Sequence, residues 1–89
     1  MKERYLEVTF RKGRPLAAYL YLPRKAGTKS VRTQEMAPGL RVDYSVGGDA
    51  IGIEITAPAR VVAEDVNVIL EQLGLEPLAP EELTPIRAA

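Results

Sequence analysis

The side chains of this chain that could carry out acid–base or nucleophilic chemistry are carboxylates, lysines, tyrosines and serines. Its 89 residues include no histidine and no cysteine. Ser-His and Cys-His nucleophile pairs, ordinary zinc sites and disulfides all need one of those two residue types, so the sequence excludes them. We therefore expect no catalytic residues, no metal site and no bound cofactor.

The nearest approach to an acid–base pair is formed by Asp43 and Glu54, on the outer side of a predicted hairpin. Two carboxylates can act as acid and base when burial separates their pKa values. A turn on Gly48-Asp49 would place them opposite each other as a repulsive pair, whereas a turn on Gly47-Gly48 places Arg41 opposite Glu54. We prefer the second register, so a small carboxylate-based enzyme is only the third functional hypothesis.

Three tyrosines and a group of cations mark a predicted interaction surface. The tyrosines occupy outward positions in two predicted strands, and residues 11–32 are rich in arginine and lysine. A basic rim around aromatic rings on a sheet can stack bases and neutralise phosphates. The same rings can instead be covered by a second protein subunit. The residues assigned to this surface are Tyr5, Tyr19, Tyr21, Arg24, Lys25 and Arg32.

The net charge of the chain is zero, but the charge is unevenly distributed. Residues 1–45 carry ten basic and four acidic side chains, and residues 46–89 carry two basic and eight acidic ones. We expect a homodimer in which the basic half of one copy meets the acidic half of the other. The alternative is nucleic-acid or anionic-ligand binding through residues 11–32. It is less favoured because the acidic half would repel phosphate.

Alternating hydrophobicity predicts the strands that position these residues. Two strands are joined by a three-residue loop, Arg11-Lys12-Gly13, which places Val8 opposite Leu16 and Leu6 opposite Ala18. The second strand ends at a proline. Its predicted inward-facing residues are Leu16, Ala18, Leu20 and Leu22.

The middle of the chain contains a basic loop, a weak strand and a strong hairpin. Residues 24–30 form the loop, and residues 31–36 alternate so weakly that they predict a short or edge strand whose pairing stays open. A turn at residues 37–39 leads into the strong hairpin. Its predicted inward-facing residues are Leu40, Val42, Tyr44, Val46, Ile51, Ile53 and Ile55.

An amphipathic helix is predicted over about residues 63–73. Its single apolar stripe is made of Val62, Val66, Ile69, Leu70 and Leu73. Gly74 ends the helix, with Leu75 folding back as in a Schellman motif. A short helical turn is predicted at about residues 80–84, where a proline occupies the first helical position.

Together these elements predict one α+β domain spanning residues 1–89. We expect an antiparallel meander of four to five strands over about residues 4–57, with the C-terminal amphipathic helix packed on one face. One short helix covers only part of such a sheet, which again favours a dimer. No apolar run approaches the roughly 20 residues of a membrane span, and residues 1–4 do not resemble a signal peptide. We therefore expect a cytoplasmic protein that does not bind membranes.

The strong hairpin also carries a recognisable motif. It contains Leu40-Arg41-Val42-Asp43-Tyr44, then Gly47-Gly48, then Ile51-Gly52-Ile53-Glu54-Ile55, and is preceded by Ala18-Tyr19-Leu20-Tyr21-Leu22. Over roughly residues 16–57 the chain resembles the bacterial domain-of-unknown-function family 2283. That resemblance implies an antiparallel sheet module with no assigned activity or cofactor. Because some members are associated with a small toxin-like protein, it also implies an antitoxin-like interaction with another small protein.

Overall fold

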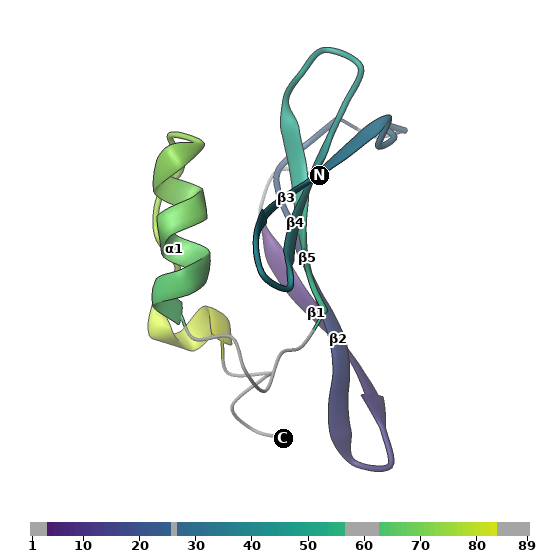
Figure 1. The fold of residues 1–89 in the computed structure, drawn as a ribbon, viewed down its shortest axis with the longest axis vertical. Coiled ribbons are helices and arrows are strands. Elements are labelled where there is room, and N and C mark those ends of the chain that lie inside the picture. Colours follow the sequence, from purple (N-terminus) through teal and green to yellow (C-terminus); the bar gives the residue numbers. More distant parts are fainter. Residues whose placement is uncertain (1–3, 26, 57–62, 84–89) are drawn as a thin grey trace.

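Five strands and one α-helix make up the described part of the protein (Figure 1). The computed structural model describes residues 4–25, 27–56 and 63–83. Its elements are β1 (Tyr5–Arg11), β2 (Arg14–Tyr21), β3 (Arg32–Ala37), β4 (Leu40–Tyr44), β5 (Ala50–Ile55), α1 (Ala63–Gln72) and the 3-10 helix η2 (Pro80–Leu83). The strands form one antiparallel sheet, which confirms the α+β class.

The strand order of the sheet is β1-β2-β5-β4-β3, so the predicted meander is wrong. The chain leaves β2, passes the ends of β5 and β4, and returns as the far edge strand. Burial explains this order, because β5 is buried at four of its six positions and needs a neighbour on each side. In contrast, β3 is exposed at four of its six positions and is suited to an edge. The edge strand predicted at residues 31–36 is confirmed, and its partner is β4.

The β1–β2 hairpin has a different register from the predicted one. Lys12 and Gly13 form a two-residue turn with φ angles of 53° and 77°, the positive values that a type I′ turn requires. Leu16 then has no partner and forms a β-bulge, so Val8 lies opposite Ala18. The predicted pairing of Val8 with Leu16 is therefore wrong, and Leu16 is exposed near the hairpin tip. Apolar residues still face apolar residues, because the bulge restores the alternation.

In the central hairpin Arg41 lies opposite Glu54, which confirms the preferred register. The turn itself begins one residue earlier than predicted, because the Gly48 N–H donates to the Ser45 carbonyl at 2.9 Å. Val46, which was predicted to face inward, is consequently at the tip and 91% exposed. Gly48 has a positive φ of 88°, which glycine adopts readily and which allows this turn.

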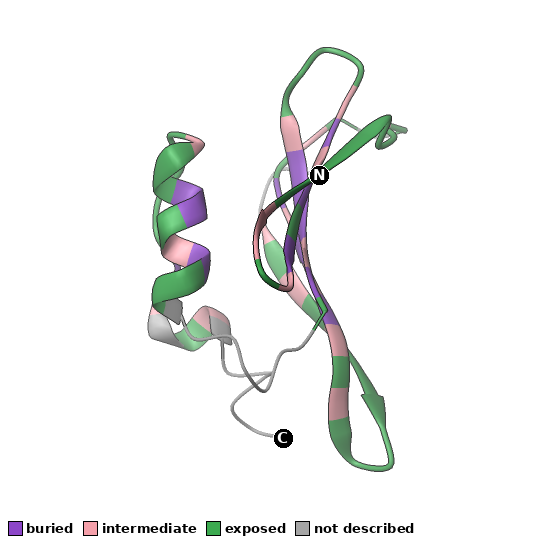
Figure 2. Ribbon diagram, viewed as in Figure 1, coloured by how far each residue is buried: buried purple, intermediate pink, exposed green. Residues whose placement is uncertain are grey.

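Twelve buried apolar residues, most of them in the sheet and in α1, belong to one cluster. They are Ala18, Leu20, Leu22, Leu40, Val42, Tyr44, Ile53, Ile55, Val66, Ile69, Leu70 and Leu78. Ile51 of β5 is also buried but lies outside this cluster. Figure 1 shows α1 alongside one face of the sheet, and Figure 2 shows its buried residues on the side toward the strands. Leu73 of the predicted helix stripe is partly buried against the cluster, whereas Val62 lies outside the described residues.

The predicted Schellman motif at the end of α1 is confirmed. The Leu75 N–H donates to the Leu70 carbonyl at 2.8 Å, and the Gly74 N–H donates to the Glu71 carbonyl at 3.0 Å. Gly74 has a φ of 74°, which L-residues with a Cβ seldom adopt. The chain then continues to η2, so α1 is not the last element of the fold.

Arg4 fastens the segment after α1 to the start of β1. Its guanidinium donates two hydrogen bonds to the Glu82 carboxylate, at 2.8 and 3.0 Å. It also donates to the carbonyls of Glu76 and Pro77, at 2.5 and 2.7 Å. This contact could not be predicted from the sequence, since its two charged partners lie 78 positions apart and share no periodic pattern.

We expect Glu82→Gln to lower the free energy of unfolding by about 1 kcal/mol at neutral pH. The hydrogen bond from Arg4 lowers the pKa of the Glu82 carboxyl from its ordinary value. Folding therefore gains stability above the unfolded pKa of about 4.3, and loses it as the pH falls through the lower folded value. Urea titrations between pH 7 and pH 3 should show the difference between wild type and variant shrinking toward acid.

The neighbouring exposed residue provides the control for this prediction. Glu81→Gln makes the same chemical change without removing a hydrogen bond to Arg4, and should cost no more than about 0.5 kcal/mol. An equal loss from the two variants, or a Glu82→Gln deficit that does not change with pH, would show that the ion pair does not stabilise the fold.

Candidate functional site

The face of the sheet opposite the buried cluster carries three tyrosines in mutual contact. The rings of Tyr5 and Tyr21 stack with their centroids 4.6 Å apart and an interplanar angle of 15°. Tyr19 meets Tyr21 edge-on at 4.7 Å, with an angle of 66°. The guanidinium carbon of Arg24 lies 5.4 Å from the centroid of the Tyr21 ring. We call Tyr5, Tyr19, Tyr21 and Arg24 the outer-face cluster.

Strand register brings the three rings together. Tyr5 lies directly opposite Tyr21, and Tyr19 is two positions along the same strand. Cross-strand and diagonal neighbours on one face of a sheet are within reach of aromatic side chains. The predicted register would have placed Tyr5 opposite Tyr19. The β-bulge in β2 therefore decides which pair stacks.

Tyr19 is anchored over the backbone of β5. A Cβ at Gly52 would overlap the Tyr19 ring, so the ring can lie there only because residue 52 is glycine. The Tyr19 hydroxyl donates to Asp43 Oδ2 at 2.7 Å, and the Thr33 hydroxyl donates to Asp43 Oδ1 at 2.5 Å. Hydrogen bonds thus connect β2, β4 and β3 across the outer face.

This environment fixes the protonation state of the tyrosine. Burial raises the pKa of Tyr19 well above its usual range, and the hydrogen bond to Asp43 raises it further. The phenol therefore stays protonated at physiological pH and acts as a hydrogen-bond donor. The acid–base pair considered from the sequence is not formed, because Asp43 is opposite Gly52 while Glu54 is opposite Arg41.

The six residues predicted to form one surface do not all lie together. Four of them make the outer-face cluster. Arg32 is opposite Tyr44 and shares its face of the sheet, with the guanidinium carbon 4.1 Å from the centroid of that ring. Lys25 lies in the connection from β2 to β3, where it lines a groove. Alternation alone could not place either cation, because Arg32 belongs to the weakly alternating residues 31–36 and Lys25 belongs to the predicted loop.

The part of the outer face around the tyrosines is acidic, although residues 1–45 as a whole are basic. The Tyr21 hydroxyl donates to Glu7 Oε1 at 3.3 Å. The charged residues near the tyrosines that share this face by register are Glu7, Glu35, Arg41, Asp43 and Glu54. Arg11 and its partner Arg14 continue the same face at the β1–β2 turn. Near the tyrosines, four carboxylates against the guanidinium groups of Arg24 and Arg41 make the surface unfavourable for phosphate.

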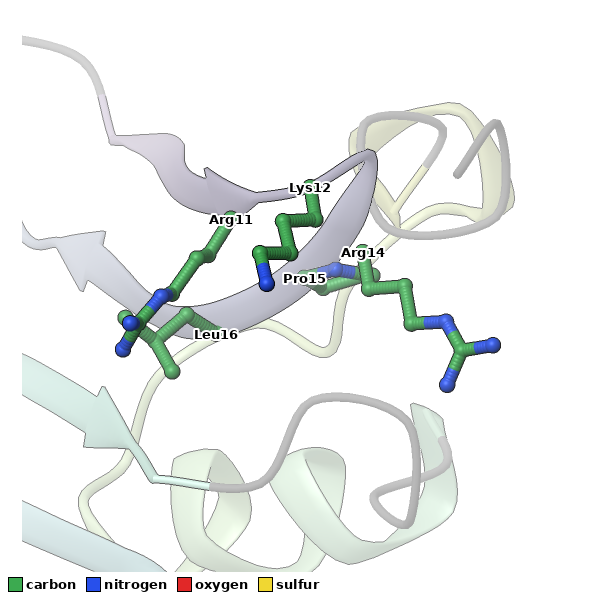
Figure 3. A pocket seen from close by; sticks show the side chains of 5 residues that line it. All are labelled: Arg11, Lys12, Arg14, Pro15 and Leu16. Carbon is green, nitrogen blue, oxygen red and sulfur yellow. The ribbon is translucent and has the colours of Figure 1, made fainter.

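Among the described residues, two further groups of cations lie at the two ends of β2. Arg11, Lys12 and Arg14 surround the β1–β2 turn, beside a shallow hollow of about 400 Å³ that Pro15 and Leu16 also line. Figure 3 shows the Arg14 side chain extending away from Arg11 and Leu16. The cations of the β2–β3 connection lie at the opposite end, roughly 25 Å away at about 3.3 Å per strand residue. The two groups therefore do not form one basic rim around the tyrosines.

Known proteins do not identify this site. No family model, no curated protein and no solved structure matches the chain. The resemblance of residues 16–57 to family 2283 therefore stays a prediction.

The described ranges, 4–25, 27–56 and 63–83, contain neither a metal-binding cluster nor a membrane-spanning helix. Within them, no three carboxylates come together in a way that could hold a metal ion. No helix in the same ranges is long and apolar enough to cross a membrane. The outer-face cluster is thus the best-organised group of functional side chains that these residues provide.

Proposed function

We propose that this protein is a non-catalytic interaction module that self-associates through the outer-face cluster. In this proposal α1 packs on one face of the sheet and a second copy covers the other face. The observation that carries it is the contact between three tyrosine rings on the uncovered face, with Tyr5 49% exposed. The resulting protein is a cytoplasmic homodimer that needs no cofactor.

The tyrosine rings are suited to a protein interface because they are both apolar and polar and because hydrogen bonds already hold them in place. Tyrosine is enriched at interfaces, since it offers a large apolar area with a polar end. Here the Tyr19 hydroxyl is held by Asp43 and the Tyr21 hydroxyl by Glu7. Because these side chains are already ordered, association would cost little further conformational entropy.

The charges of the outer face also suit a twofold contact. In a symmetric dimer the same surface meets itself, so each copy must present groups of both signs. Arg41 lies between Glu54 and Glu35 on the neighbouring strands. Its guanidinium could therefore meet carboxylates or tyrosine rings of the second copy, in place of the contact between basic and acidic halves expected from the sequence.

Sedimentation equilibrium tests this proposal. The wild-type chain should dimerise, and the double variant Tyr5→Ser/Tyr21→Ser should bind itself about tenfold more weakly or worse. Val68→Ser is the control, because it removes an apolar side chain that is 54% exposed on α1, and it should leave the dimer unchanged. A wild-type monomer at high concentration and moderate salt, or an equal effect of Val68→Ser, would remove the proposal.

A second use of the same face is the binding of another small protein, as in an antitoxin. Only the resemblance of residues 16–57 favours that role. Nucleic-acid binding through residues 11–32 is the alternative function, and the two basic groups at the ends of β2 support it. It would replace the first proposal if an oligonucleotide bound with strong salt dependence and Arg24→Ala or Lys25→Ala weakened that binding.

A further inference from the structure

A groove lies at the end of the sheet where the β2–β3 connection passes the β4–β5 turn. Its volume is about 730 Å³, within the roughly 300–1,000 Å³ typical of small-molecule sites. Lys25 and Lys29 line it from the connection, and Val46 and Asp49 line it from the turn. The strand order creates this groove, because the connection must pass the ends of β5 and β4 to reach the far edge.

Backbone hydrogen bonds hold both ends of the connection in place. The Leu22 N–H donates to the Ile51 carbonyl of β5 at 3.1 Å, and the Val31 N–H donates to the Tyr44 carbonyl of β4 at 2.9 Å. The two walls of the groove are therefore joined to the sheet directly. A groove fixed in this way loses little freedom when a ligand enters it.

The lysines are the cations in the groove that remain for a ligand. Arg24 also lines it, but its guanidinium already donates to the Leu22 and Ile51 carbonyls. Lys25 and Lys29 are exposed. Among the described residues that line the groove, Asp49 is the only carboxylate, so the net charge of this lining is positive.

The groove also has an apolar component. Val31 is 63% exposed and Val46 is 91% exposed, and they line the groove from opposite walls. A ligand that covers them removes apolar surface from water, which an inorganic anion cannot do. We propose that the groove binds a small organic anion, a carboxylate or a phosphate ester, whose charge pairs with Lys25 and Lys29 and whose aliphatic body covers Val31 and Val46.

This site is independent of self-association. The groove shares only Arg24 with the outer-face cluster, and the proposed ligand does not depend on that residue. A failure of the dimer proposal would therefore leave the ligand proposal standing, and the reverse is also true.

Amide chemical shifts of the ¹⁵N-labelled chain provide the test. Hexanoate and hexyl phosphate are the two amphiphilic probes. Hexanol has the same aliphatic chain without the negative charge, and inorganic phosphate has the negative charge without the aliphatic chain. At least one amphiphile should shift the signals of Gly27, Gly47 and Ile51 in a saturable way, with a Kd on the order of millimolar for so few atoms. Hexanol and phosphate should bind about tenfold more weakly.

Matched charge variants make the result specific to the groove. Lys25→Gln/Lys29→Gln should weaken the amphiphile about tenfold, whereas Lys12→Gln/Arg14→Gln removes the same charge at the other end of β2 and should change the Kd less than about twofold. Both pairs are exposed, so neither double variant is expected to unfold the chain.

Four results would overturn the proposal. The first is the absence of saturable shifts with both amphiphiles, and the second is equal binding of hexanol. The third is equal binding of inorganic phosphate, and the fourth is an equal loss in Lys12→Gln/Arg14→Gln. An oligonucleotide that shifted the same signals more strongly, with the same dependence on Lys25 and Lys29, would replace the small anion with a nucleic acid.

Discussion

Leu70→Ala should lower the free energy of unfolding by about 3–4 kcal/mol. Leu70 of α1 is fully buried in the cluster that also contains the sheet residues. Truncation to alanine loses the transfer free energy of three carbons and leaves a cavity. Since a domain of this kind is stable by only about 5–15 kcal/mol, the loss would be a large fraction of the total. Urea denaturation followed by circular dichroism measures it.

The control lies on the other side of the same helix. Val68 is 54% exposed, so Val68→Ala should change the stability by less than about 0.5 kcal/mol. If the two variants had similar effects, α1 would not be packed on the sheet. Both faces of the sheet would then be open to a partner, and the proposed self-association would no longer be directed to the outer face.

Gly52→Ala should lower the free energy of unfolding by about 2 kcal/mol. The added Cβ would occupy the space of the Tyr19 ring, so the ring must move off β5 and give up its hydrogen bond to Asp43. Overpacking costs typically about 1–3 kcal/mol, and a lost hydrogen bond adds about 1 kcal/mol. Alanine is favoured over glycine within a strand by about 0.5–1 kcal/mol, which offsets part of this cost. In a domain of this size, thermal unfolding should show a midpoint lower by about 8–16 °C.

Two further variants show whether the ring is the cause. Gly47→Ala places a Cβ no closer than 3.7 Å to other atoms at a residue without a positive φ, so it should cost little. In a Tyr19→Ala background the ring is absent, and adding Gly52→Ala should then have almost no effect. Additive losses in the double variant would mean that the two residues do not interact.

Hydrophobic alternation predicted most of the secondary structure and most of the core. The inward positions of Leu20, Val42 and Ile53 follow from period-two patterns, and those of Ile69 and Leu70 follow from the helical stripe. These predictions succeed because burial of one face imposes its period on the sequence. The exact residues at strand ends are less determined, because a turn can start one residue earlier without changing which face is buried.

The errors lie where one local feature changes the pairing. Leu16 and Val46 have the right type and parity for the core, but a β-bulge and an early turn leave both at hairpin tips. The predicted meander was wrong because the hydrophobic pattern within each strand does not determine which strands become neighbours in the sheet. Only the relative burial of β5 and β3 shows which strand needs two neighbours.

The candidate site was predictable only in part. Alternation correctly placed Tyr5, Tyr19 and Tyr21 on one face, away from the core. The contact between Tyr19 and Gly52 exists because β2 lies beside β5, which the sequence pattern did not indicate. Contacts that depend on the order of strands in the sheet cannot be predicted from the hydrophobic pattern within each strand.

The most direct test of self-association through the outer face is an isotope-filtered NOE experiment on an equal mixture of labelled and unlabelled chains. If the proposal is right, intermolecular cross-peaks will connect the ring protons of Tyr5 and Tyr21 with outer-face residues of the other copy, such as Arg41. Cross-peaks confined to the exposed side of α1 around Val68, in a sample that sedimentation shows to be dimeric, would contradict it.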